Sequence, residues 1–243
     1  SPSFSFLDGL QLSADYYDID VKNRITPLSA QRIVDECSSG TSPLLCNQIV
    51  RNAGTGLIER VDDRQVNAAA GVTGGVDIEL RYDMEPDFIS SQNENLRLRL
   101  FANHMLENSV TTTVYRDDVG SLTSPEWNAT ATMGYDIGNW GINWVTRYYD
   151  STNYTLGFGV HWRSGFEVDD ATIASQTVNN MSVSYRGETN SGANWVASFN
   201  VNNMFDRDPP IVASQNLRGG QQGVSNVFDV FGRRYQVSLN YSF

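Results

Sequence analysis

The two cysteines, Cys37 and Cys46, have the fewest possible chemical roles of the reactive residues in this sequence. Eight residues separate them in the stretch CSSGTSPLLC. A close pair with neither a partner histidine nor a second cysteine pair makes a poor zinc site, so the choice lies between two buried thiols and a disulfide. The disulfide is favoured. A loop this short would gain about 2 to 3 kcal/mol in the chain-entropy model, and the bond would indicate an oxidising compartment.

The other reactive side chains do not form a catalytic set that spacing can identify. The sequence has two histidines, His104 and His161, and neither can be placed with a serine and an aspartate in a triad. Neighbouring aspartates could offer oxygen ligands to calcium, but solvated loop charge is the favoured interpretation. The pairs are Asp62 and Asp63, Asp117 and Asp118, and Asp169 and Asp170. We therefore predict no enzyme activity, no metal site and no cofactor.

Length, charge and hydropathy narrow the class of protein. The 243 residues carry a formal charge of -11, and Lys22 is the one lysine, which argues against a nucleic-acid partner. Mean hydropathy is -0.36, and no apolar run approaches the roughly 18 residues of a membrane-spanning helix. A transmembrane β-barrel remains possible, because its strands alternate apolar and polar residues and therefore score as polar on average.

Alternation of apolar and polar residues recurs along the chain with the period of two that is typical of β-strands. At the C-terminus the aromatic and aliphatic residues from Tyr235 to Phe243 share one side of the strand. Two central segments, VTGGVDIELRYDM and NLRLRLFANHML, carry charges opposite an apolar face. The charged residues predicted to face a water-filled interior are Asp77, Glu79, Arg81, Arg97 and Arg99. Ion pairs within the wall explain these charges equally well.

The pattern predicts an all-β protein with eight antiparallel strands. They are expected at residues 7–22, 66–84, 95–107, 126–137, 139–150, 177–188, 193–204 and 229–243. Short or moderate connections alternate with long ones, so every long loop should lie at one end of the sheet. The long connections are 23–65, 108–125, 151–176 and 205–228. An outer-membrane barrel has this pattern, with short periplasmic turns and long extracellular loops.

The first long connection, 23–65, is expected to contain short helices. Ser29 is placed to cap a turn through Glu36, and Ser42 with Pro43 is expected to open a helix that ends near Gly54. The segment 154–162 also alternates, and it is interpreted as a strand above the membrane or as an extension of the wall.

Aromatic residues favour a membrane barrel over a soluble one. A soluble sandwich or lipocalin-like barrel also alternates, but its apolar face points inward. Trp127, Trp140 and Tyr148 fall at strand ends, where interfacial aromatic girdles lie, and the charges fall in mid-strand, where a wet lumen would take them.

Two stretches near the C-terminus resemble the last two strands of TonB-dependent outer-membrane receptors: NVNNMFDRDPP, at 200–210, and YQVSLNYSF, which ends the chain. Segments 12–25 and 74–83 also resemble this barrel, as does the cysteine-bearing loop between them, so the resemblance covers essentially the whole chain. The motif residues that carry it best are Asn202, Asn203, Phe205, Asp206, Pro209 and Pro210.

The resemblance implies a 22-stranded up-and-down barrel in the outer membrane of a Gram-negative bacterium. Such receptors import an iron chelate, cobalamin or a carbohydrate with energy passed on by TonB, and a plug domain fills the barrel. No plug or TonB box is found in residues 1–243, so we expect the chain to be the last eight strands of a barrel. Its expected partners are lipid, plug, TonB, an unnamed ligand and the barrel-assembly machinery, with Tyr241 and Phe243 as the assembly signal.

Two alternatives stay open at this point. Backbone groups in a bilayer must be paired, so eight strands must either join further strands or close on themselves. A self-contained eight-stranded outer-membrane barrel, structural or adhesive, is the first alternative, and a soluble ligand-binding β-barrel is the second.

Overall fold

The structure is a computed structural model of the 243-residue chain. It describes residues 8–26, 28–63, 66–89, 92–111, 115–153, 172–210, 212–213, 222–223 and 228–242. The alternating segment 154–162 and residue Phe243 lie outside the described residues.

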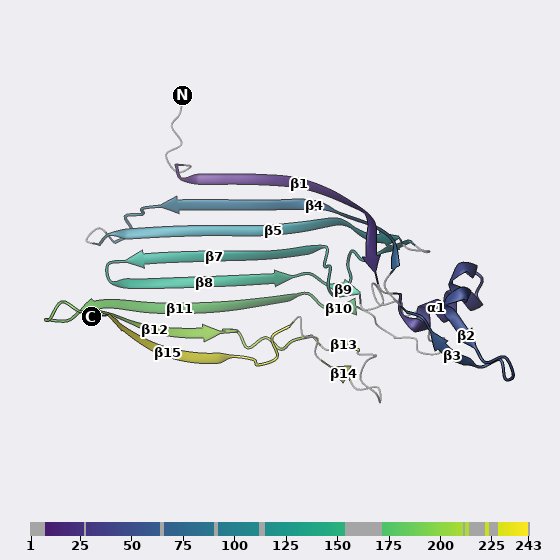
Figure 1. The fold of residues 1–243 in the computed structure, drawn as a ribbon. Coiled ribbons are helices and arrows are strands. Elements are labelled where there is room, and N and C mark those ends of the chain that lie inside the picture. The colour runs from purple at the N-terminus through teal and green to yellow at the C-terminus, as the bar shows by residue number, and fades with distance from the viewer. Residues whose placement is uncertain are drawn as a thin grey trace, which may run out of the picture.

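Eight long strands pair in chain order as one antiparallel sheet (Figure 1), which confirms the predicted fold class. They are β1 (Leu10–Thr26), β4 (Val66–Met84), β5 (Glu94–Thr111), β7 (Trp127–Ile137), β8 (Trp140–Tyr149), β11 (Gln176–Glu188), β12 (Asn194–Asn202) and β15 (Arg234–Ser242). The short strand β6 (Tyr115–Asp117) pairs with β5. All eight predicted strands are present. Their ends differ: β1 and β5 run several residues further than expected, and β15 begins five residues later.

The long connections all leave the same end of the sheet, as predicted, and we call this the loop end (Figure 1). It carries helices α1 and η2 and three short hairpin-like pairs. These pairs are β2 (Ile49–Arg51) with β3 (Ile58–Val61), β9 (Thr152–Asn153) with β10 (Thr172–Ile173), and β13 (Val212–Ala213) with β14 (Gln222–Gly223). The opposite end, with the connections after β4, β7 and β11, is the turn end.

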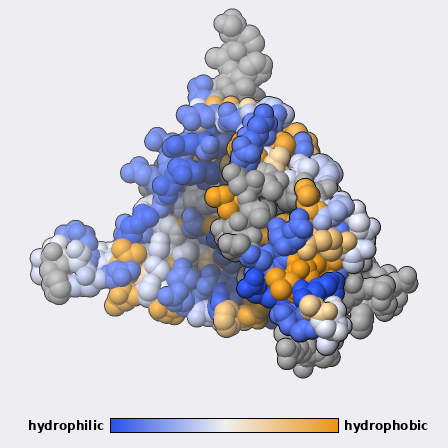
Figure 2. Space-filling model, turned by 45° about the vertical axis from the view of Figure 1, so that its right-hand side comes forward, coloured by the Kyte–Doolittle hydropathy of each residue, from blue (hydrophilic) through white to orange (hydrophobic). Residues whose placement is uncertain are grey.

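Cross-strand register separates the sheet into two faces. One row of paired residues crosses all eight strands: Leu10, Tyr82, Leu98, Met133, Trp144, Met181, Val201 and Tyr235. A parallel row on the other side contains Asp83, Arg97, Gly134, Asn143, Ser182, Asn200 and Gln236. We call these the apolar face and the polar face. Figure 2 shows a hollow with mostly hydrophilic sides and hydrophobic residues along the outer margin.

No second layer packs on the apolar face of the described sheet. Leu12, Val237 and Leu239 are 70, 79 and 69% exposed. Buried apolar side chains gather instead in the connections at the loop end, in two small clusters: Leu122, Ile173 and Phe228, and Leu28, Ile33 and Leu45. A soluble barrel buries its apolar face, so this arrangement does not match the soluble alternative.

Aromatic residues on the apolar face step toward the turn end from strand to strand. On each strand we take the aromatic residue nearest the turn end and count its offset from the row that contains Tyr82. The offset is two positions on β7, four on β8 and β11, and six on β12 and β15, for Tyr135, Trp140, Tyr185, Trp195 and Tyr241. Other aromatic residues on this face, among them Trp144, Phe199 and Tyr235, lie nearer the loop end. The steps describe a line that runs obliquely across the strands.

Two glycines fix the register by admitting an aromatic ring from the neighbouring strand. A Cβ at Gly187 would lie 2.4 Å from the indole of Trp195, its cross-strand partner. A Cβ at Gly75 would lie 2.6 Å from the Tyr17 hydroxyl, again across a strand pair. A side chain at either position would collide with its partner, so each glycine allows one close pairing.

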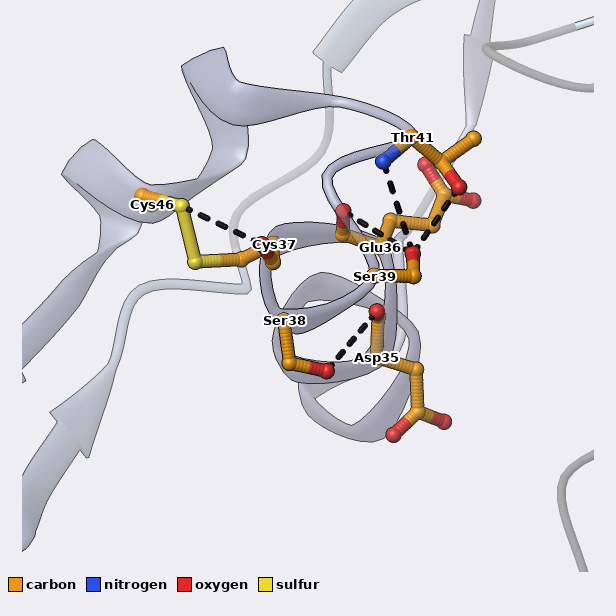
Figure 3. Close-up of a disulfide and its surroundings, with 7 residues drawn as sticks. All are labelled: Asp35, Glu36, Cys37, Ser38, Ser39, Thr41 and Cys46. Atoms are coloured by element: carbon orange, nitrogen blue, oxygen red, sulfur yellow. Dashed lines mark hydrogen bonds between the residues drawn. A yellow bond between two sulfur atoms is a disulfide. The ribbon is translucent and has the colours of Figure 1, made fainter.

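The first long connection forms a small module with its own core. Helix α1 (Ala30–Ser38) begins at Ser29, whose Oγ accepts a hydrogen bond of 3.3 Å from the Arg32 N–H, as predicted. Cys37 and Cys46 form the disulfide (Figure 3), which joins α1 to the 3₁₀ helix η2 (Pro43–Gln48). No helix among the residues with an assigned position is long and apolar enough to span a membrane.

The predicted helix from Ser42 to Gly54 is wrong. Pro43 does open a helix, but Ser42 makes no side-chain cap and the helix ends at Gln48. The β-branched pair Ile49 and Val50 then enters β2, as such residues favour strands. The following turn is held by Asn52, whose Oδ1 accepts hydrogen bonds of 2.9 Å from the backbone N–H groups of residues 54 and 55.

Candidate functional site

Three arginines and two aspartates form ion pairs on the polar face near the turn end. The Asp136 carboxylate on β7 binds Arg97 on β5 and accepts a 2.7 Å bond from Arg186 on β11. Arg81 pairs with Asp83 on its own strand at 2.6 Å. The side chains of Arg97 and Arg186 are about half exposed, so each pair contributes little stability and chiefly orients the guanidinium groups.

A glycine on β8 makes room for this network. A Cβ at Gly141 would lie 2.8 Å from the Ser184 hydroxyl and 3.1 Å from Asp136, so a side chain there would displace these groups. At Gly134 on β7 a Cβ would lie 3.5 Å from the Arg97 guanidinium, which is an ordinary contact distance.

All five charged residues expected to face an interior lie on the polar face. Asp77 accepts a 2.7 Å bond from the Asn103 amide, while Arg99 lies directly opposite Arg81. For Glu79 and Arg99 no ion pair with a described residue is found. Arg97 forms a cross-strand ion pair of the kind expected within the wall, whereas Arg81 pairs with Asp83 on its own strand. The five side chains therefore do not converge on one site.

The polar face changes character between the two halves of the sheet. On β1, β4 and β5 it carries Asp15, Asp77, Glu79, Arg81, Asp83, Arg97 and Arg99. From β7 to β15 it is dominated by amides and hydroxyls. These are Asn128, Thr130, Thr132, Asn143, Asn180, Ser182, Ser184, Ser198, Asn200, Asn202, Gln236, Ser238 and Asn240. We call this second half the amide strip.

A cleft of about 530 Å³ opens on the amide strip at the loop end. Five strands from β7 to β15 contribute to it, and Phe228 and Asp229 lie at its edge. Its lining includes Asn128, Thr130, Arg147, Tyr149, Gln176, Val178, Asn180, Asn202, Phe228, Asp229 and Arg234. Volume, concavity and a mixture of aromatic and polar groups are the features of a small-ligand site.

Packed connections hold one side of the cleft in place. Phe228 is 7% exposed and meets the Tyr149 ring edge-on at 5.4 Å between centroids. The Tyr149 hydroxyl donates a hydrogen bond to the Leu122 carbonyl. Arg234 forms an ion pair with Asp229, next to Phe228. Segments that follow β5, β8 and β12 are thereby joined above the polar face.

The motif around Asn203 is a turn that ends β12. Asn203 is 2% exposed and has a φ of 51°, in the left-handed region. Its amide donates to the Arg207 carbonyl at 2.9 Å and accepts from the Arg207 N–H at 2.8 Å. Its own N–H donates to the Asn180 side chain at 2.8 Å. Asparagine tolerates this backbone conformation and offers both a donor and an acceptor.

The next residues of the motif connect this turn to the last strand. Asp206, also left-handed at 54°, accepts a 2.9 Å bond from the Arg233 N–H at the start of β15. Phe205 is 65% exposed, with its ring 6.0 Å from that of Trp144. Pro209 and Pro210 are half-buried in the connection. Asn202 lines the cleft instead.

Sequence reasoning did not identify Asp136, Arg147 or the role of Asn203. Asp136 stands between Tyr135 and Ile137, so the alternation placed it on the polar face. Its ion-pair partners could not be predicted, because they come from strands that are far away in sequence. An asparagine at the end of an alternating segment was the one available signal for the turn. Tyr241 lies on the apolar face beside Trp195, consistent with its predicted parity.

Comparison with protein-family models finds one that covers most of the chain. The model described as TonB dependent receptor-like, beta-barrel matches residues 3–204. The match includes seven of the eight long strands and ends inside the Asn203 motif. No curated protein matches the chain.

Replacing Asn203 by alanine should destabilise the full-length protein by about 3 kcal/mol. The backbone N–H and carbonyl of Arg207 would lose their hydrogen-bond partner, and the left-handed backbone would lose the residue that tolerates it. The measurement is the temperature at which the folded band disappears from heated detergent gels. Asn203→Gly should recover about 1 kcal/mol, because glycine adopts this φ without strain. Asn200→Ala is the control on the same strand, and an unchanged transition for Asn203→Ala would contradict this role.

Proposed function

Since the chain belongs to the TonB-dependent receptor-like β-barrel family, we propose that it forms the C-terminal barrel wall and extracellular loops of a nutrient receptor. The family is one of outer-membrane receptors for TonB-dependent transport and not one of enzymes. The proposed activity is active uptake of a scarce nutrient, an iron chelate, cobalamin or a carbohydrate, across the outer membrane of a Gram-negative bacterium. The oblique aromatic line on an unpacked apolar face is the observation that carries this proposal.

That line has the slope expected of an interfacial girdle. Between Tyr82 on β4 and Tyr241 on β15 the offset is six residues over six strand spacings. One residue advances about 3.3 Å along a strand, and neighbouring strands lie about 4.8 Å apart. These spacings give an angle of roughly 35° between the strand direction and the perpendicular to the aromatic line. Transmembrane barrel strands tilt by 35–45°, so the line supports a membrane surface that crosses the sheet here.

The free edges of the sheet support a larger barrel. Strand β1 pairs with β4 alone and β15 with β12 alone, at opposite edges of the described sheet. Unpaired edge groups are too costly in hydrocarbon, so both edges need further strands. We therefore assign residues 1–243 to the last eight strands of the family's 22-stranded barrel, with the plug domain elsewhere in the protein. A self-contained barrel would require β1 to pair with β15.

The remaining partners follow from this position. Lipid covers the apolar face, and the polar face lines the lumen beside the plug. The module of residues 28–63 projects with the other connections on the extracellular side, where its disulfide suits an oxidising environment. TonB supplies energy through the plug, and the barrel-assembly machinery recognises Tyr241 and Phe243 at the end of the last strand.

Uptake of the nutrient should depend on this protein and on TonB together. Cells that express the full-length receptor are expected to import a labelled nutrient, drawn from ferric citrate, cobalamin and maltoheptaose. Deletion of the receptor gene, deletion of tonB, or a protonophore should each abolish import. Surface binding should survive the last two treatments. Import that persists without TonB would contradict active transport by this receptor.

Removal of Phe243 from the full-length receptor should reduce its amount in the outer membrane severalfold. Phe243 is the terminal apolar side chain of the last strand, and we propose that the barrel-assembly machinery recognises this side chain. Surface levels can be measured by whole-cell antibody binding to an epitope in the 28–63 module. Phe243→Trp, which keeps an aromatic side chain at the terminus, is the control and should keep the wild-type level. Equal surface levels for wild type and the Phe243 deletion would refute the assigned signal.

A further inference from the structure

The side chains of the cleft indicate what chemical class of ligand it takes. Amides are the commonest polar group in its lining, and each carries both a donor and an acceptor. The side chains of Asn128 on β7 and Asn202 on β12 make no hydrogen bond to any described residue, and both residues are half-buried at the surface of the cleft. A ligand that binds here therefore meets side chains whose hydrogen-bonding capacity is available.

The charge of the cleft is small. Arg234 is neutralised by its ion pair with Asp229, and for Arg147 the structure shows no ion pair with a described residue. One uncompensated guanidinium among several neutral amides is a weak attraction for a multiply charged anion. Anion sites in proteins instead gather several arginines or lysines in bidentate or clustered arrangements. A metal chelate with several negative charges is poorly matched to this lining.

The hydrogen-bonding groups of the cleft suit the hydroxyls of a sugar. A sugar hydroxyl donates and accepts at once, as does an amide, so neighbouring hydroxyls can be paired without leaving an unsatisfied group. The half-buried ring of Tyr149, held from behind by the buried Phe228, adds aromatic surface for the apolar face of a pyranose ring. Beyond the cleft, neutral polar residues continue along the amide strip as far as Asn143 and Ser182. The ion pairs of Asp136 with Arg97 and Arg186 follow nearer the turn end.

We propose that the cleft binds a neutral oligosaccharide and that the amide strip is the wall along which it passes. This inference rests on the proposed function and selects one class of nutrient from those that the transport hypothesis allows. Asn128 and Asn202 are the positions that contact sugar hydroxyls. Arg147 acts as a further donor whose charge is not required.

Calorimetric titration of the purified full-length receptor tests this assignment. The neutral probes are maltoheptaose, xylohexaose and cellohexaose, and the anionic probe is ferric citrate. At least one neutral probe should bind, and Asn128→Ala and Asn202→Ala should each weaken it about fivefold to tenfold, the usual effect of a lost hydrogen bond. Glu79→Gln, on the polar face but outside both the cleft and the amide strip, should change the affinity less than twofold. Arg147→Gln, which keeps a donor, should change it less than about fivefold.

Two results would overturn the assignment. The first is failure of every neutral probe to bind. The second is binding of ferric citrate that falls more than tenfold in Arg147→Gln, which would show that the cleft recognises charge. Either result leaves TonB-dependent uptake to be judged by the import measurement, so the ligand class and the transport function fail separately.

Discussion

The pairing register of the eight long strands is the constraint on which the rest of the structure depends. Side chains alternate with a period of two, so a slip of one residue would transfer every apolar residue of a strand to the polar face. Glycines at 75 and 187 each admit one aromatic partner, and the turn at Asn203 fixes where β12 stops. These contacts keep the apolar rows continuous from β1 to β15.

An exposed apolar face of this size is costly in water. Burial of one leucine or valine side chain is worth about 1.5 to 3 kcal/mol, and many such residues on this face are largely exposed. Hydrocarbon offsets that cost, provided that all backbone groups are paired. The strands make an angle with the perpendicular to the aromatic line that matches the tilt of barrel strands from the membrane normal. The strand register with the tilt derived from it, and the exposure of the apolar side chains, therefore lead to one orientation.

Period-two alternation was enough to predict the strands, the two faces and the grouping of long connections at one end. It could not predict where strands end, because ends such as Asn202 depend on a turn rather than on alternation. The Ser42–Pro43 cap signal misled the prediction of a helix to Gly54, because the strand propensity of Ile49 and Val50 ended the helix at Gln48. The cleft and the bonds of Asp136 were not predictable, since both join residues that are distant in sequence.

The outward direction of the apolar face is tested most directly by spin labels at consecutive positions of β4. Single substitutions Val76→Cys through Arg81→Cys would be labelled in the full-length receptor, reconstituted in liposomes; the bonded Cys37 and Cys46 do not compete for the label. Collision with lipid-soluble oxygen should peak at positions 76, 78 and 80, and collision with a water-soluble nickel chelate at 77, 79 and 81. The opposite phase, or no alternation, would contradict the orientation described above.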